Sequence, residues 1–204
     1  MKELALAPSR VVLATHNERK VDELCNLLQS LPVEFVSLSV VAPDAPAAVE
    51  DGVTLEENVK HKALFYANLL GEPCLADEFS ITVDGEVMTD QTESALVDEL
   101  TAAHTDRVEA VYTCALTLAY PNDGWPLTVT GTLDGEVRVD SHGDDGYVYD
   151  GHFWLVSGHT LADASETERA RLSPRRRAAN HLRDAVMRRW AVPVGQVTVY
   201  PVSD

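Results

Sequence analysis

The chain has 204 residues, of which 45% are hydrophobic, and this length favours one α/β domain with a full core over two small domains. Against 16 Lys and Arg stand 33 Asp and Glu, so the formal net charge of −17 argues against a long phosphate-tracking surface for DNA or RNA. No apolar stretch approaches the length of a membrane span, and the first ten residues lack the apolar region of a signal peptide. We therefore expect a single domain over residues 1–204, located in the cytoplasm, with no nucleic-acid or membrane partner.

The three cysteines, Cys25, Cys74 and Cys114, follow no CxxC or other metal-ligand spacing. Their odd number argues for reduced thiols in a cytosolic setting and against a zinc site. We interpret them as small core residues.

The first predicted unit is a strand followed by a helix. Residues 10–14 (RVVLA) indicate a short buried strand. Apolar residues then recur at helical spacing, namely Val21, Leu24, Leu27, Leu28 and Leu31. The two elements form a βα unit with the loop THNERK at its hinge.

The loop THNERK can bind an anion without the glycines of a P-loop. Thr15 and Asn17 can donate hydrogen bonds to phosphate oxygens at a helix N-terminus, and Lys20 supplies a point charge. The alternative interpretation is an ordinary N-cap followed by a surface lysine.

A second helix begins at Thr54, where Thr54 and Glu57 form a capping-box pattern, and ends at Gly71. A buried strand, PCLAD, follows it and is predicted to end at the acidic pair Asp77–Glu78. Carboxylates at the carboxyl end of a strand suit Mg²⁺, which binds oxygen and keeps phosphates in its shell. The alternative is a solvated acidic turn. Lys62 either reaches into such a site or extends from the apolar face of its helix into solvent.

The second half of the chain predicts antiparallel strands and two further helices. Residues 108–119 and 127–139 are strand-like, with Asp134–Gly135 as a two-residue hairpin turn, so the sheet is expected to be mixed. Helices are predicted to begin after Ser165 and Ser173, the second with Pro174 at its first position.

Residues 143–154 (GDDGYVYDGHFW) combine glycines with Tyr147, Tyr149 and Asp150. An aromatic face beside a carboxylate can clamp a nucleobase, since the ring stacks and the carboxylate accepts from the edge of the base. The alternative is a glycine-rich hairpin with core tyrosines.

Taken in order, these segments resemble the inosine triphosphate pyrophosphatase family over about residues 10 to 190. LATHNERKVDEL is similar to the opening strand, loop and helix of the family, and TLEENVKHKA to its Glu-Asn helix with a later lysine. LADEFSITVD resembles Ala-Asp-Asp-Ser-Gly-Leu-x-Val-Asp, and GYVYDGHF resembles Gly-Phe-Gly-Tyr-Asp-Pro-x-Phe. TLADASETERARLSPR is similar to the stretch that ends in Ser-His-Arg. The resemblance implies an elongated mixed β-sheet flanked by helices with a central nucleotide cleft.

The resemblance also implies roles for single residues. Those for substrate binding are Thr15, Asn17, Lys20, Lys62, Tyr147, Tyr149, Asp150, Arg169 and Arg175. Glu57 and Glu78 would hold Mg²⁺, and Asp77, Glu78 and Lys62 would serve catalysis. The implied reaction splits a nucleoside triphosphate into monophosphate and pyrophosphate, and we expect the enzyme to be a homodimer.

This chain departs from the family pattern mainly on the base-reading side. Glu78 replaces an aspartate, Phe79–Ser80 replace Ser-Gly, Val148 replaces a glycine, and Pro174 replaces a histidine. The family segment Pro-Gly-Val-x-Ser-Ala-Arg-Tyr has no counterpart in residues 86–100. We therefore expect an altered base preference. The alternative is a homologue that binds a nucleotide or a partner protein with weak or no turnover.

Overall fold

The computed structural model describes residues 5–49, 51–83, 86–88, 98, 102, 106–124, 126–143 and 150–191. Its main sheet has seven strands in the order β3-β2-β4-β6-β7-β8, with β5 attached to β4. These strands are β2 (Arg10–Leu13), β3 (Glu34–Ser37), β4 (Cys74–Val83), β5 (Glu86–Met88), β6 (Arg107–Ala119), β7 (Leu127–Arg138) and β8 (Phe153–Trp154). A separate parallel pair joins β1 (Ala5–Leu6) to β9 (Trp190–Ala191).

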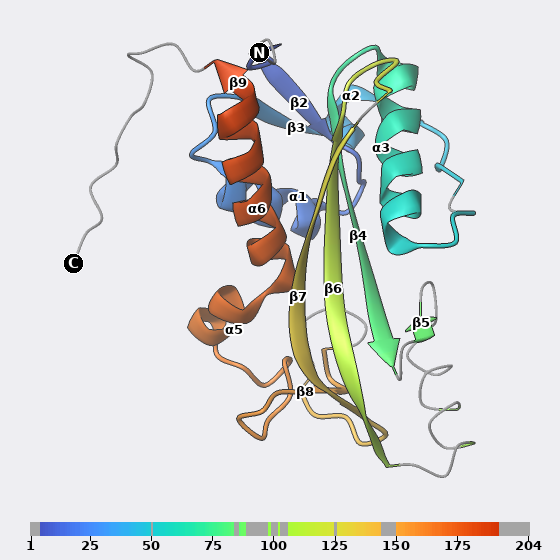
Figure 1. The fold of residues 1–204 in the computed structure, drawn as a ribbon, viewed down its shortest axis with the longest axis vertical. Coiled ribbons are helices and arrows are strands. Elements are labelled where there is room, and N and C mark those ends of the chain that lie inside the picture. Colours follow the sequence, from blue (N-terminus) through green and yellow to red (C-terminus); the bar gives the residue numbers. More distant parts are fainter. Residues whose placement is uncertain are drawn as a thin grey trace, which may run out of the picture.

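The helices are α1 (Glu18–Leu28), α2 (Leu38–Val41), α3 (Leu55–Leu70), α5 (Glu166–Leu172) and α6 (Pro174–Arg189). Figure 1 shows α1 and α6 on one side of the long central strands and α3 on the other. The predicted caps are confirmed: Thr54 and Glu57 form a capping box, while Ser165 and Ser173 cap α5 and α6. None of the described helices combines the length and apolar character needed to cross a bilayer.

The sheet changes character at β4. Strands β3, β2 and β4 run parallel, whereas β4, β6, β7 and β8 pair antiparallel, so the predicted mixed sheet is confirmed. Residues from α1 and α6 pack with Leu13, Leu75 and Leu116 in one core cluster, and α3 packs with the opposite face in another. The lower half of the sheet has its own cluster around Tyr112 and Phe153.

The predicted hairpin turn at Asp134–Gly135 is wrong, because β7 runs straight through these residues. Asp134 pairs with Val111 and Gly135 with Ala110 of β6. A Cβ atom at Gly135 would lie 2.6 Å from the ring of Phe153, so this glycine serves close packing rather than a turn. The Asp-Gly pair looks the same in the sequence whether it forms a hairpin turn or a closely packed position within a strand.

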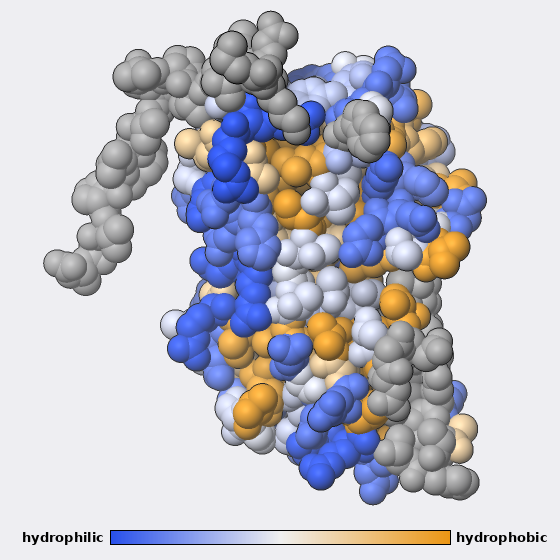
Figure 2. Space-filling view, in the orientation of Figure 1, coloured by the Kyte–Doolittle hydropathy of each residue, from blue (hydrophilic) through white to orange (hydrophobic). Residues whose placement is uncertain are grey.

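Side chains of α6 cover the backbone edge of β7. His181 Nδ1 lies 2.7 Å from the Thr130 carbonyl oxygen, and Arg177 donates to the carbonyl of Thr132. In Figure 2 the outer surfaces of α6 and α3 are mostly hydrophilic, and a paler strip of near-neutral residues runs between them. The edge of β7 is thus occupied by side chains, which removes it as a site for strand pairing.

Gly131 is where α6 comes closest to the sheet. A Cβ atom there would overlap the Pro174 carbonyl oxygen and the Ala178 amide. We expect Gly131→Ala to lower the free energy of unfolding by about 1–3 kcal/mol through overpacking. Urea denaturation measures this, with Gly124→Ala as the matched control because no atom lies within 4 Å of its added methyl. Equal stability of the two variants would contradict the expectation.

Candidate functional site

The acidic pair Asp77–Glu78 lies in the middle of a strand, not at its end as predicted. β6 pairs with β4 along its whole length, from Cys74 to Val83, and so extends the strand past the acidic pair. The parallel partner β2 ends at Leu13, opposite Leu75. The two carboxylates therefore lie just beyond the carboxyl end of β2 while β4 continues antiparallel to β6.

Strand alternation separates the two carboxylates, because successive side chains of a strand point to opposite faces. Asp77 interacts with Lys20 of α1 and Arg175 of α6, whereas Glu78 interacts with Lys62 of α3. β4 thus carries one lysine–carboxylate pair on each face.

Asp77 is the buried centre of the first face, with 1% of its side chain exposed. Its Oδ2 lies 2.8 Å from Arg175 Nη2 and 3.3 Å from Lys20 Nζ. Arg175 is itself fully buried, and its other terminal nitrogen pairs with Glu23 of α1. Asp77 Oδ1 is buried and has no hydrogen-bond partner among the described residues. One acceptor at this centre is therefore available to a donor from water or a ligand.

The positive neighbours determine the protonation of Asp77. Burial by itself raises the pKa of this carboxyl, but Arg175, Lys20 and Lys62 outweigh burial, and the net pKa lies below its ordinary value. Asp77 is therefore a carboxylate at neutral pH.

The lowered pKa of Asp77 has a consequence for acid stability. The pKa of Asp77 is lower in the folded protein than in the unfolded chain, where it is about 3.9. The ionised carboxylate therefore stabilises the folded protein fully above that unfolded pKa, and this stabilisation is lost as the pH falls through the folded pKa. We expect Asp77→Asn to flatten the fall in unfolding free energy on the acid side of pH 4. Urea denaturation at a series of pH values tests this, and an unchanged slope would contradict it.

The second face of β4 carries a close ion pair. Lys62 Nζ lies 2.7 Å from Glu78 Oε2, and the two side chains are 17% and 19% exposed. Lys62 is therefore paired with Glu78 and mostly buried rather than extended into solvent, and its role in binding or catalysis stays a prediction.

The loop before α1 organises itself through local hydrogen bonds. Asn17 Oδ1 accepts from the amides of Arg19 (3.1 Å) and Lys20 (3.3 Å), and Thr15 Oγ1 accepts from the amide of Asn17 (3.2 Å). Asn17 is thus the N-cap that the alternative interpretation describes. Lys20 is not a surface lysine, however, because its amine lies against Asp77. The phosphate-binding roles of Thr15 and Asn17 stay predictions.

Glu57 is engaged at the start of α3. Its Oε2 accepts from the amides of Val53 (2.9 Å) and Thr54 (3.2 Å). Within the described ranges, no three His, Cys, Asp or Glu side chains form a group that could hold a metal ion. Glu57 and Glu78 are oxygen donors of the type that Mg²⁺ prefers, so the residues present fit this ion only if phosphates and water supply most of its ligands.

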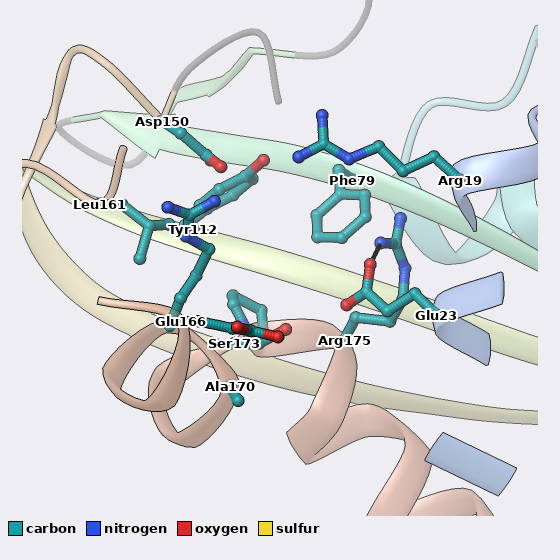
Figure 3. Close-up of a pocket in the computed structure, with 12 residues that line it drawn as sticks. Arg19, Glu23, Phe79, Tyr112, Asp150, Leu161, Glu166, Ala170, Ser173 and Arg175 are labelled. Carbon is teal, nitrogen blue, oxygen red and sulfur yellow. Dashed lines mark hydrogen bonds and ion pairs between the residues drawn. The ribbon is translucent and has the colours of Figure 1, made fainter. Parts of the chain in front are cut away.

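A cavity of about 180 Å³ lies beside the Asp77 face. Phe79 of β4 and Tyr112 of β6 form its sheet side, and Figure 3 shows α5, with Glu166 and Ala170, facing them from the other side. The remaining lining residues are Arg19, Glu23, Asp150, Leu161, Arg169, Ser173, Pro174 and Arg175. The cavity therefore has an aromatic wall, with charged groups around it.

Three predicted substrate-binding residues line this cavity. Asp150 is 2% exposed and Arg175 is fully buried, so both polar side chains are held away from bulk water. Arg169 donates from Nη2 to the carbonyls of Ala162 and Ala164, each at 3.1 Å, and so also holds the preceding loop. Tyr147 and Tyr149 lie outside the described residues.

Sequence reasoning missed Glu23, Phe79 and Tyr112. Glu23 was detectable, since it lies three residues after Lys20 and therefore on the same face of α1. Phe79 was missed because the strand was predicted to end at Asp77–Glu78, whereas β4 continues to Val83 and places Phe79 on the Asp77 face. Tyr112 gave no separate signal, because an aromatic residue within a strand is more often part of the core.

The mixed sheet with helices on both faces and a charged strand beside a cavity defines an α/β protein with a candidate ligand-binding site. The profile of the Ham1 family matches residues 11–185, and the chain belongs to this family. This confirms both the family and the fold class predicted from the motifs.

Curated and solved proteins show how far the similarity extends. A dITP/XTP pyrophosphatase of Exiguobacterium sp. is 36% identical over 188 residues, which cover 85% of this chain and 94% of that protein. The dITP/XTP pyrophosphatase of Escherichia coli O157:H7 is 32% identical, covering 87% and 98%. A HAM1 protein structure from Coxiella burnetii matches with a TM-score of 0.76 at 26% identity, covering 89% and 100%.

Proposed function

We propose that this protein is a Mg²⁺-dependent nucleoside triphosphate pyrophosphatase, which releases a nucleoside monophosphate and pyrophosphate. The observation that carries the proposal is a lysine–carboxylate contact on each of two consecutive residues of β4, with a cavity that has an aromatic wall beside the Asp77 face. The names of the relatives, dITP/XTP pyrophosphatases, support the same reaction.

The two lysines would bind the phosphates. Lys20 and Lys62 are each paired with a carboxylate, so both amines are positioned before a triphosphate binds and can turn to its phosphate oxygens. Their positive charge then offsets the charge that develops on the phosphate oxygens.

The carboxylates would handle the water. Asp77 keeps a lowered pKa and remains with Arg175, which makes it a weak base that orients its neighbours. Glu78, once Lys62 turns to a phosphate, is the carboxylate placed to accept a proton from water. Glu57 and Glu78 would hold Mg²⁺, which supplies a Lewis acid for the phosphate oxygens when bound.

The base preference is expected to differ from that of the family. Pro174 lines the cavity and has no side-chain hydrogen-bond donor, so the contact of the histidine in the family motif is lost. A site that lacks such a donor discriminates less between bases. The homodimer, the cytoplasmic location and the single domain over residues 1–204 stay predictions.

A pyrophosphate-release assay with a panel of standard and modified nucleoside triphosphates tests the proposal. We expect release from at least one triphosphate, dependence on Mg²⁺ and loss of activity with a chelator. Binding of a nucleotide without any release would favour the alternative of a nucleotide-binding homologue. An exclusive preference for inosine or xanthosine triphosphate would contradict the altered base preference.

Lys20→Ala should weaken triphosphate binding by roughly 10- to 100-fold, because it removes a charge-assisted contact to phosphate. Binding of the corresponding nucleoside should stay the same. Titration calorimetry with both ligands measures the difference, and Lys60→Ala, an exposed lysine of α3, is the control. Equal losses for triphosphate and nucleoside would show that Lys20 does not act on the phosphates.

A further inference from the structure

Phe79 lies where the charged centre and the cavity meet. It follows Asp77 by two residues on β4, so its side chain is on the same face of the sheet. The side chain is only partly buried and lines the cavity. The ring therefore has one part in contact with the protein and another part that a ligand in the cavity can reach.

The Phe79 ring contacts both the charged centre around Asp77 and the aromatic wall of the cavity. Its centroid lies 4.5 Å from Arg175 Cζ and 5.9 Å from Lys20 Nζ, within the range of cation–π attraction. On its other side it lies 5.3 Å from the ring of Tyr112. Figure 3 shows the Phe79 ring between the guanidinium of Arg175 and the Tyr112 ring.

Phe79 also fixes the orientation of Arg175. The two terminal nitrogens of Arg175 are engaged by Glu23 and Asp77, and Phe79 packs against the guanidinium carbon. A guanidinium held in this way has little freedom to turn, so its position relative to the cavity is set before a ligand binds.

We propose that Phe79 is the base-binding surface of this site: the base of the substrate stacks on its ring, and the ring holds Arg175 in place at the same time. This inference rests on the proposed function. The ligand expected in the cavity is a flat, aromatic ring. It would lie between Phe79 and Tyr112 on one side and Ala170 and Pro174 on the other. The phosphates would extend from that ring toward Lys20, whose amine lies 5.9 Å from the centre of the Phe79 ring.

The test separates the ring of the ligand from its phosphates. A non-hydrolysable nucleoside triphosphate carries both, and inorganic tripolyphosphate carries the phosphates alone. We expect Phe79→Leu to weaken binding of the nucleotide by roughly 10- to 100-fold, as for loss of one base–aromatic stack. Binding of tripolyphosphate should change by less than about threefold, and Phe79→Tyr, which retains the ring, should bind the nucleotide as the wild type does.

Phe65→Leu is the matched control, because it removes the same atoms from an exposed position on α3 that does not line the cavity. Circular dichroism melting establishes that each variant is folded, and Phe79→Met replaces Phe79→Leu if the latter unfolds. Equal losses for both ligands, no loss for either, or failure of the wild type to bind the nucleotide would each overturn the inference.

The outcome is independent of turnover. If the wild type releases no pyrophosphate but Phe79→Leu still affects only the nucleotide, the proposed reaction fails while the stacking role holds. If the wild type is active and the two ligands respond alike to Phe79→Leu, the reaction holds and the stacking role fails. With active protein, the loss in Phe79→Leu should appear in KM rather than in kcat, since stacking acts equally on bound substrate and transition state.

Discussion

Arg175→Met is expected to lower the free energy of unfolding by about 3–5 kcal/mol, the cost of breaking a buried ion pair by removing one partner. Arg175 is fully buried, and its side chain pairs with Asp77 from β4 and with Glu23 from α1. Methionine fills similar volume, so the loss comes from the carboxylate of Asp77, which keeps its burial and loses its nearest cation. Urea denaturation at neutral pH measures the change.

Two further variants make this result specific. Arg176→Met, at the next and exposed position of α6, should leave stability unchanged to within about 0.5 kcal/mol. Adding Asp77→Asn to Arg175→Met should recover part of the loss, because the buried charge is removed and the two sites are coupled. A loss of less than about 1 kcal/mol in Arg175→Met would mean that Arg175 contributes little to holding α6 against β4.

Glu78→Gln is expected to lower kcat for pyrophosphate release by roughly 10²- to 10⁴-fold while the fold is preserved, since an amide cannot take a proton from water. Lys62 Nζ lies 2.7 Å from the Glu78 carboxylate. The substitution replaces that carboxylate by a neutral amide, which is a weaker acceptor for the lysine. Initial rates at saturating Mg²⁺ measure the effect, with circular dichroism as the check on folding.

Glu56→Gln is the matched control for this prediction, because Glu56 is an exposed carboxylate in the first turn of α3. Glu78→Asp restores the residue of the family motif. In an active enzyme built around Glu78 the shorter side chain should reduce the rate, since displacement of a catalytic group by about 1 Å can cost on the order of 10²-fold. Equal rates for the wild type and Glu78→Gln would remove Glu78 from the mechanism.

The cysteines illustrate a part of the interior that composition predicted correctly. Cys74 and Cys114 are fully buried, and all three cysteines are free thiols. Burial raises the pKa of the Cys74 thiol to about 12, so it is protonated and unreactive at neutral pH. The interpretation as small core residues is therefore confirmed for these two.

The sequence by itself determined the features that depend on neighbours along the chain. The capping box of Thr54 and Glu57 and the N-caps of α5 and α6 are local hydrogen bonds, so residue type and spacing are sufficient to predict them. The family motifs likewise identified the family and the fold class, since several of them follow one another along the chain in the order of the family.

Only the tertiary structure decided how the charges are paired. Arg175 meets Asp77 98 positions away and Glu23 152 positions away, and no local pattern encodes such distances. The pairing of β6 with β4 kept Asp77 and Glu78 inside a strand and sent their side chains to opposite faces. The same pairing made Gly135 a packing position instead of a turn, because a glycine that permits close approach and one that permits a turn look identical in the sequence.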